Sequence, residues 1–129
     1  MRVTRWGGLA LAVTMMMVGC GSKDGSRKPR IGLSMDTLKE ERWQKDRDLF
    51  VAKCKALGAE VLVQAANSND ALQNSQAENL LTQKVDVLVV VPHNGKSAAT
   101  IVESAHKAGV PVISYDRLIL DSDVDLYIS

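Results

Sequence analysis

Polar side chains of three kinds follow the strand-like segments of this chain. Asp36 comes after the first such segment, and Arg42 and Trp43 stand in the first turns of the helix-like segment behind it. Asp116 and Arg117 come after the fourth. A carboxylate accepts hydrogen bonds, a guanidinium group donates them in a fixed fork, and an indole offers a flat apolar face. A sugar needs such acceptors and donors for its hydroxyls and an apolar surface against its C–H face, so the sequence predicts a sugar site.

The turn after the third strand-like segment holds a further polar pair, His93 and Asn94. Asn94 offers an acceptor and a donor to a ligand, but asparagine is also favourable at the start of a helix, so the pair could instead cap the helix that follows. Trp43 could equally pack in the core, and Asp116 with Arg117 could form a surface ion pair that contributes little. We predict that six residues contact the sugar: Arg42, Trp43, Asp116, Arg117, Asp36 and Asn94.

Residue patterns that carry catalysis or hold cofactors do not occur in this sequence. The glycines near its start neither follow a strand nor match a dinucleotide fingerprint, and it contains no Walker-type loop. The two histidines and Cys54 lack the spacing of a metal site, and no serine, histidine and aspartate stand in a recognisable triad context. We therefore expect no enzyme activity, no cofactor and no metal.

The charge balance argues against a nucleic-acid partner. Sixteen basic residues face fifteen acidic ones, which gives a net charge of +1, and no basic cluster occurs in the part expected to fold. Proteins that bind nucleic acids concentrate lysine and arginine on one face. A small basic stretch, which we interpret as a solvated tether near lipid headgroups, contains Lys23, Arg27, Lys28 and Arg30.

Strand-like and helix-like segments alternate from Arg30 onward and must position the polar side chains. Apolar or alternating runs predict strands at residues 31–35, 60–64, 87–91, 110–114 and 124–128. Helical spacing predicts helices over about 38–57, from a cap at 68–70 to about 83, and over 98–108. Repeated strand–helix units form parallel sheets with helices on both faces, so we expect a doubly wound α/β fold. Such sheets bind ligands beyond the carboxyl ends of their strands.

The pattern also predicts which parts of these elements are buried. Residues 87–91 are apolar throughout, which predicts a central strand, whereas 124–128 alternate and predict a half-exposed edge strand. Cys54 falls on an inward face, where we interpret it as a small buried hydrophobe rather than a reactive thiol. The helix positions expected to face the core are Phe50, Cys54, Leu57, Leu72, Ala77, Leu80, Leu81, Ala98, Ile101, Val102, Ala105 and Ala108.

The first twenty residues resemble the signal of a bacterial lipoprotein. Arg2 and Arg5 precede an apolar run over residues 9–18, and Met17-Val18-Gly19-Cys20 has the form of a cleavage site. The run is shorter than the roughly 20 apolar residues of a membrane span. We expect a signal peptide at 1–19, lipid attachment at Cys20, a flexible tether at 20–29 and a folded unit at 30–129. The folded unit would then be held at the extracytoplasmic face of the cell membrane.

Four segments carry a resemblance to a known family. They are Arg30-Ile31-Gly32-Leu33-Ser34-Met35, Glu41-Arg42-Trp43-Gln44-Lys45-Asp46-Arg47-Asp48, Val85-Asp86-Val87-Leu88-Val89-Val90-Val91-Pro92-His93-Asn94-Gly95 and Ser114-Tyr115-Asp116-Arg117. These segments resemble the D-xylose-binding proteins of sugar ABC transporters, which belong to the type I periplasmic sugar-binding proteins. The second and fourth segments point most narrowly to the xylose branch.

In that family, two similar lobes joined by a hinge trap a sugar and present it to a membrane permease. The resemblance implies that the ligand is a monosaccharide, most narrowly D-xylose, and that Lys39 lies at the cleft edge beside the predicted contacts. Family members continue into a second lobe, so we expect residues 30–129 to be an incomplete N-terminal lobe. An alternative is an extracytoplasmic sugar receptor that partners a membrane histidine kinase.

Overall fold

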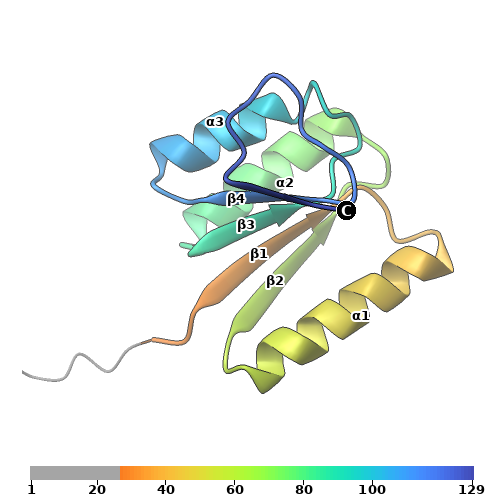
Figure 1. The fold of residues 1–129 in the computed structure, drawn as a ribbon, viewed down its shortest axis with the longest axis vertical. Coiled ribbons are helices and arrows are strands. Elements are labelled where there is room, and N and C mark those ends of the chain that lie inside the picture. Colours follow the sequence, from red (N-terminus) through yellow and green to blue (C-terminus); the bar gives the residue numbers. More distant parts are fainter. Residues whose placement is uncertain (1–26) are drawn as a thin grey trace, which may run out of the picture.

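The computed structural model describes residues 27–129, which contain strands and helices in alternation (Figure 1). The elements are β1 (Arg30–Met35), α1 (Glu41–Ala56), β2 (Glu60–Ala65), α2 (Asp70–Thr82), β3 (Val87–Val90), α3 (Ala99–Lys107), β4 (Val112–Tyr115) and β5 (Leu126–Ile128). Within this range, no helix combines the length and apolar character that a membrane crossing requires. The predicted signal peptide at 1–19 and the lipid-attachment residue Cys20 lie outside the described residues.

The strands form one parallel sheet in the order β2-β1-β3-β4-β5. β1 pairs on both sides, so that Ile31 lies opposite Val61 in β2 and opposite Val87 in β3. β3 is the middle strand and β5 an edge strand, as the sequence predicts. The predicted half-exposed pattern of β5 is wrong, because Leu126, Tyr127 and Ile128 are all exposed and neither face of this strand is covered. α2 and α3 lie together over one face of the sheet, and α1 lies over the other (Figure 1). This arrangement confirms the doubly wound α/β fold.

The apolar run of β3 supplies two separate hydrophobic clusters. Leu88 and Val90 pack in the cluster that contains residues of α2 and α3, whereas Val89 and Val91 pack in the cluster that contains Trp43 of α1. Successive side chains of a strand point to opposite faces, so a strand covered on both faces is apolar at every position. The run of valine and leucine is therefore explained by the central place of this strand.

Gly32 allows α2 to pack closely against the sheet. A Cβ atom at this position would lie 2.9 Å from Cδ1 of Leu88 and 3.3 Å from Cδ1 of Leu80. Both leucines are fully buried, and a close-packed core leaves them little room to move aside. Because Gly32 has no side chain, Leu80 of α2 can pack directly against β1.

Three of the predicted core positions are wrong. Leu57 is 74% exposed, Leu72 is 40% exposed, and Ala108 is exposed as well. Leu57 and Ala108 are the residues at which α1 and α3 end, and the chain turns away there through Gly58 and Gly109, both at positive φ. Leu57 and Ala108 follow the apolar spacing of their helices, but each helix ends before them, so their side chains do not reach the core.

The error at Leu72 has a different cause: the next residue, the polar Gln73, takes the inward position of α2 that we expected for Leu72. The inward positions of α2 belong to Gln73, Ala77 and Leu80, which follow helical spacing and are all buried. Leu72 is one residue earlier, so it is turned toward solvent at the first turn of the helix. The N-cap at Asn69 is as predicted, because its side chain accepts a hydrogen bond from the backbone amide of Leu72 at 2.8 Å.

The first helix starts later than the sequence predicts, at Glu41 instead of near residue 38. The backbone amide of Lys39 donates to Oγ1 of Thr37 at 3.1 Å, which holds this segment in a turn. Glu40 is extended, and its carbonyl accepts from the amides of Trp43 and Gln44 at 3.1 and 3.3 Å. The turn therefore places Arg42 and Trp43 in the first turn of α1, beside the end of β1.

A loop without a helix joins β4 to β5, and it packs against the turn that follows β3. Ile119 of this loop is buried in the cluster under α2 and α3, and the amide of Leu120 donates to the carbonyl of Gly95 at 2.9 Å. A Cβ atom on Gly95 would lie 2.7 Å from the backbone oxygen of Leu118. The contact leaves no room for a side chain, so it fixes the loop that begins with Asp116 and Arg117.

Candidate functional site

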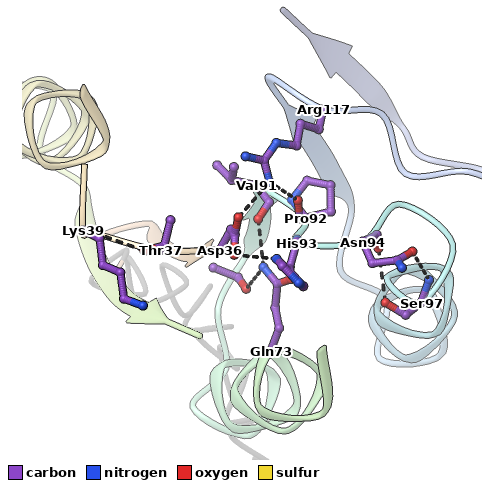
Figure 2. Close-up of polar contacts among 11 residues, drawn as sticks. Asp36, Thr37, Lys39, Gln73, Val91, Pro92, His93, Asn94, Ser97 and Arg117 are labelled. Carbon is purple, nitrogen blue, oxygen red and sulfur yellow. Dashed lines mark hydrogen bonds and ion pairs between the residues drawn. The ribbon is translucent and has the colours of Figure 1, made fainter. Parts of the chain in front are cut away.

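The candidate site is the carboxyl edge of β1, β3 and β4. Because these strands are neighbours in the parallel sheet, the segments that follow them meet at one edge. Asp36 follows β1, His93 and Asn94 follow β3, and Asp116 and Arg117 follow β4. Figure 2 shows Asp36, His93, Asn94 and Arg117 gathered at this edge. The residues predicted from the sequence are therefore brought together.

Asp36 lies at the centre of the edge and is almost completely buried. Its Oδ2 accepts a hydrogen bond from Nη1 of Arg117 at 2.7 Å, and its Oδ1 lies 2.9 Å from Nδ1 of His93 (Figure 2). The side chain is only 5% exposed. Both carboxylate oxygens are thus engaged by protein groups, so Asp36 holds two neighbouring residues in place. The direct sugar contact predicted for it remains a prediction.

Arg117 is tied to the edge on one side and open on the other. Besides its ion pair with Asp36, its Nη1 donates to the carbonyl oxygen of Pro92 at 3.1 Å. The side chain is nevertheless 43% exposed. A guanidinium group has five N–H donors, so the anchored group retains donors for a ligand.

Trp43 is buried, and its ring is the platform for two cations. It packs with Leu33, Met35, Val89 and Val91 and is only 5% exposed. Cζ of Arg42 lies 4.6 Å and Cζ of Arg117 lies 5.6 Å from the ring centroid. Such contacts are favourable because the ring face carries negative charge density.

The burial of Trp43 bears out the core packing that the sequence left open for this residue. Its ring is covered by core side chains and by two guanidinium groups. Trp43 therefore positions Arg42 and Arg117 at the edge of the sheet. The sugar contact predicted for it remains a prediction.

Asp116 forms an ion pair with Arg42 across the edge. Nη2 of Arg42 donates to Oδ1 of Asp116, and Nε of Arg42 lies 3.8 Å from Oδ2 of Asp46. The hydrogen bond to Asp116 is the chief reason that the pKa of Arg42 is raised above its ordinary value. The alternative of an ion pair at Asp116 is thus realised, but its partner is Arg42 and not the adjacent Arg117.

The backbone at Asp116 adopts a sparsely populated conformation. Its φ is +65°, and the amide of Arg117 donates to the carbonyl of Tyr115 at 2.8 Å, which closes a three-residue turn around Asp116. The amide of Asp116 in turn donates to the carbonyl of Ile128 at 2.7 Å. Strained residues of this kind persist only where their surroundings fix them, and they concentrate at functional sites. Here the turn and the end of β5 direct the carboxylate toward Arg42.

Two hydroxyls on β4 support this region. Oγ of Ser114 donates to the carbonyl of Arg117 at 2.5 Å and accepts from the amide of Ile119 at 3.1 Å. The hydroxyl of Tyr115 donates to Oδ2 of Asp46 at 3.0 Å. Burial, and then the bond to Asp46, raise the pKa of Tyr115 above its ordinary value, so this phenol stays protonated as a donor. β4 is thereby connected to α1 as well as to the loop.

Asn94 does not cap α3, the role that the sequence offered as an alternative to ligand binding, because the N-cap of this helix is Ala98 and has no side-chain hydrogen bond. Oδ1 of Asn94 accepts from the amides of Lys96 at 2.9 Å and Ser97 at 3.3 Å, at the turn that leads into α3. Figure 2 shows this contact to Ser97. These hydrogen bonds hold the turn; they engage the side-chain oxygen and leave the NH₂ group of this exposed residue to donate to a ligand. The sugar contact predicted for Asn94 remains a prediction.

Lys39 lies beside the edge, on the segment between β1 and α1. Its side chain is exposed, and Figure 2 shows it apart from the cluster around Asp36. Its structural contact is made by its backbone amide, which donates to Thr37. The structure therefore places Lys39 at the periphery of the site.

Gln73 is a residue of the site that our sequence reasoning missed. Its side chain is buried, with 2% exposed. Its Nε2 donates to the carbonyl of Val91 at 2.9 Å and to Oγ of Ser34 at 3.3 Å. Its Oε1 accepts from the amide of His93 at 2.9 Å. It therefore joins α2 to the ends of β1 and β3. The available signal was its position four residues before Ala77 and seven before Leu80, on the inward face of α2.

Within residues 27–129, no group of three or more histidine, cysteine, aspartate or glutamate side chains is arranged to hold a metal ion. Cys54 is buried, and its burial raises the pKa of the thiol above its ordinary value. A thiol with a raised pKa is a poor nucleophile and a poor metal ligand. The interpretation of Cys54 as a packed core residue is thus confirmed.

Residues 31–129 match a family model described as a periplasmic binding protein domain. A D-xylose-binding periplasmic protein of Haemophilus influenzae is 48% identical to the chain over 118 residues, and that of Escherichia coli K12 is 44% identical over 121. These alignments cover 92% and 94% of this chain but only 34% and 36% of the relatives. The chain therefore spans about a third of the length of the relatives that it matches.

The fold also matches solved structures. An ABC transporter solute-binding protein from Clostridium phytofermentans, solved with bound β-D-glucose, superposes with a TM-score of 0.73 at 36% identity. The superposition covers 76% of this chain and 31% of that protein. The family match includes every site residue from Asp36 to Arg117.

Proposed function

The chain belongs to the periplasmic binding protein domain family, and from this premise we propose that residues 30–129 are the N-terminal lobe of a protein that binds D-xylose for an ABC importer. The resemblance to D-xylose-binding proteins is confirmed by the identities of 48% and 44%. Those relatives are named for D-xylose binding, and the solved relative holds a hexose. They support a monosaccharide as the ligand class and a pentose as the ligand.

The observation that carries this proposal is the convergence of two ion pairs over one indole. Arg42 pairs with Asp116, and Arg117 pairs with Asp36. Both guanidinium groups lie within 6 Å of the Trp43 ring, at 4.6 and 5.6 Å. Fixed donors beside a carboxylate suit the hydroxyls of a polyol, because each hydroxyl both donates and accepts.

The proposed roles follow from which atoms are free. Arg42 and Arg117 donate to sugar oxygens with the N–H groups that their ion pairs leave unused. Asp116 accepts from a hydroxyl with its second oxygen, and Asn94 donates with its amide. No covalent bond is made or broken in such binding, so the proposed function requires neither a catalytic residue nor a cofactor.

The proposal includes an extracytoplasmic location and a lipid anchor. The relatives are named as periplasmic proteins, which supports a location outside the cytoplasm. The anchor is supported by the sequence around Cys20, which has the form of a lipoprotein cleavage site. In this arrangement residues 20–29 act as the tether between the membrane and the lobe, and a membrane permease receives the sugar.

Lipid attachment can be tested separately from sugar binding, because the chain has two cysteines. Cells that express the protein and take up an alkyne-labelled fatty acid should label it at Cys20. Cys20→Ser should abolish the label, and Cys54→Ser should retain it. Equal labelling of the two variants would contradict the proposed anchor.

Sugar binding is tested by titrating the 129-residue chain with D-xylose, D-ribose and D-glucose and following backbone amides by NMR. Weak binding is expected, because a second lobe that closes over the ligand normally excludes water. D-xylose should shift the amides of residues 36–37, 93–94 and 116–117 more than either other sugar does. If none of the three sugars shifts these amides, the proposed function is wrong.

A matched pair of arginine variants shows whether the proposed edge binds the sugar. Arg42→Ala removes a donor at the site, whereas Arg47→Ala removes an arginine on the same helix that pairs with the exposed Asp48 at 2.8 Å. Only Arg42→Ala should weaken binding. Equal effects of the two variants would show that the sugar binds elsewhere.

A receptor that reports to a membrane histidine kinase would use the same binding edge. Sugar titration therefore does not separate this alternative from import. The genes beside the coding sequence do, since permease and ATPase genes favour import and an adjacent histidine kinase gene favours sensing.

A further inference from the structure

We infer that His93 is a further sugar contact, which accepts a hydroxyl hydrogen at Nε2, and that Asp36 is the positioning residue that gives His93 this role. The inference rests on the proposed function and adds a specific acceptor to the same site. It starts from the carboxylate that His93 and Arg117 share.

The first step concerns the charge of Asp36. Its Oδ2 lies 2.7 Å from Nη1 of Arg117, and a guanidinium group can only donate. An ionised carboxylate has no hydrogen to donate, so both of its oxygens can only accept. Oδ1 of Asp36 therefore accepts from the group beside it, which is Nδ1 of His93 at 2.9 Å.

The second step concerns the histidine ring. Because Oδ1 of Asp36 accepts, Nδ1 of His93 carries the hydrogen. A neutral imidazole has one N–H, so the other nitrogen, Nε2, has a free lone pair and accepts. Asp36 thus selects the tautomer of His93, as a carboxylate does for a histidine that must present its other nitrogen to a partner.

The third step concerns how firmly the ring is held. The backbone amide of His93 donates to Oε1 of Gln73 at 2.9 Å, and Gln73 is anchored by its bond to the carbonyl of Val91 at 2.9 Å. Figure 2 shows Gln73 and Asp36 contacting His93 through its backbone and its ring, respectively. The residue is therefore fixed at two points before any ligand arrives.

The fourth step concerns where the ring leads. Asp36 is 5% exposed, whereas the His93 side chain is 36% exposed. The ring therefore connects a buried charge to the solvent at the edge where the ligand is proposed to bind. Nε2 is the polar atom of the ring that Asp36 does not engage.

Besides the free oxygen of Asp116, a second acceptor suits the site, because a sugar has several hydroxyl hydrogens to donate. Arg42 and Arg117 only donate, both oxygens of Asp36 are engaged by protein groups, and Oδ1 of Asp116 is engaged by Arg42. A sugar hydroxyl that accepts from an arginine still has its own hydrogen to donate. Nε2 of His93 supplies an acceptor for that hydrogen.

The tautomer can be measured without any ligand, because the second histidine provides an internal reference of the opposite kind. His106 contacts Oδ2 of Asp125 at 2.9 Å through Nε2, whereas His93 contacts Asp36 through Nδ1. Long-range ¹H–¹⁵N spectra of the 129-residue chain at neutral pH should show the hydrogen on Nδ1 of His93 and on Nε2 of His106. A His93 ring with its hydrogen on Nε2 would overturn the inference.

The sugar contact is tested with two amides that mimic different halves of the ring. His93→Asn keeps a donor near Asp36 but removes the acceptor at Nε2, whereas His93→Gln extends a carbonyl oxygen toward the position of Nε2. D-xylose affinity, measured by NMR titration, should fall about threefold to tenfold in His93→Asn, which is the effect of one hydrogen bond. His93→Gln should retain more affinity than His93→Asn. The control Arg47→Ala, which removes an arginine that pairs with the exposed Asp48, should bind as the unaltered chain does.

Failure of the inference is distinguishable from failure of the proposed function. If the unaltered chain binds D-xylose and His93→Asn binds it equally well, His93 is not a contact and the proposed function stands. If the unaltered chain binds no sugar, the proposed function is wrong and the contact falls with it. If His93→Asn does not fold, the tautomer measurement and the His93→Gln variant still decide. Binding by His93→Gln that is weakened as much as binding by Arg42→Ala would contradict the acceptor role.

Discussion

Arg42 and Asp116 are 74 residues apart in the chain and form an ion pair at the edge of the sheet. Arg42 stands in the first turn of α1, and Asp116 is the residue after β4. The Arg42 side chain is 60% exposed and the Asp116 side chain 23% exposed. In so exposed a pair, solvent screens most of the attraction, so its value to stability is small. Its consequence is positional, since it holds a donor and an acceptor side by side where a ligand would bind.

Asp116→Asn should separate binding from folding. Asparagine tolerates positive φ, so the turn at φ +65° is retained. The change removes the charge that accepts from Arg42 and that we propose accepts from the sugar. We expect D-xylose affinity to fall roughly tenfold or more, as for loss of a hydrogen bond to a charged group. The melting temperature should hardly change. Calorimetric titration and thermal unfolding measure the two effects.

The control for this variant is Asp48→Asn on α1, which removes an exposed carboxylate that pairs with Arg47. It should leave both affinity and melting temperature unchanged. A large loss of stability in Asp116→Asn, with affinity preserved, would show that the pair with Arg42 serves the fold and not the ligand.

Gln73→Leu should destabilise the lobe far more than an exposed glutamine variant does. The change leaves the amide of His93 and the carbonyl of Val91 buried without their partner. An orphaned buried polar group costs about 1–3 kcal/mol, so the free energy of unfolding should fall by about 2–4 kcal/mol. Urea denaturation measures it. Gln83→Leu, at the exposed end of α2, should cost less than about 0.5 kcal/mol, and comparable losses in the two variants would contradict the role given to Gln73.

Gly95→Ala should disturb the site through the backbone. Its Cβ would lie 2.7 Å from the backbone oxygen of Leu118, which cannot move aside without shifting the loop that carries Arg117. We expect a loss of about 1–3 kcal/mol in stability together with weaker D-xylose binding. Gly58→Ala is the matched control, because its Cβ would meet nothing within 4 Å although φ is +84° there. It should lower stability and leave affinity intact.

The fold could be predicted because each element depends on nearby residues. The unbroken apolar run of residues 87–91 indicates a strand covered on both faces, and Asn69 before α2 indicates the N-cap of that helix. The errors at Leu57 and Ala108 arise where glycine ends a helix while the apolar spacing continues for one more residue. Spacing reports the face of a helix but not the residue at which the chain turns away.

The site could be predicted only in part, because its pairings depend on long-range geometry. That Asp36, Arg42 and Asp116 meet at one edge follows from the order of strands and helices. The order of elements does not predict which carboxylate pairs with which cation, because Asp36 contacts His93 and Arg117, which lie 57 and 81 positions away in the chain. Gln73 was missed because a polar residue on the inward face of a helix reads as a defect in the pattern unless its distant partners are known.

Acid should weaken the lobe through Asp125, which fastens the start of β5. Its Oδ2 accepts from the amide of Val112 at 2.7 Å and from His106 at 2.9 Å. The bond from Val112, and then that from His106, lower the pKa of Asp125 below its ordinary value of 3.8. A lowered folded-state pKa contributes stability that is present above the ordinary value and lost as pH falls through the folded-state value.

Asp125→Asn should therefore flatten the decline of stability below about pH 4, with little change in its shape near pH 7. The bond from the amide of Arg30 is the chief cause that lowers the pKa of Asp86 below its ordinary value. Protonation of Asp86 therefore still lowers the stability of Asp125→Asn in acid. Asp123→Asn, in the same loop, is the control and should follow the unaltered chain. Thermal unfolding between pH 3 and 7 measures this, and an unchanged acid limb in Asp125→Asn would exclude Asp125 as its source. Because the amide of Asp116 is held by the carbonyl of Ile128, loosening β5 should also loosen the turn that directs Asp116 toward Arg42.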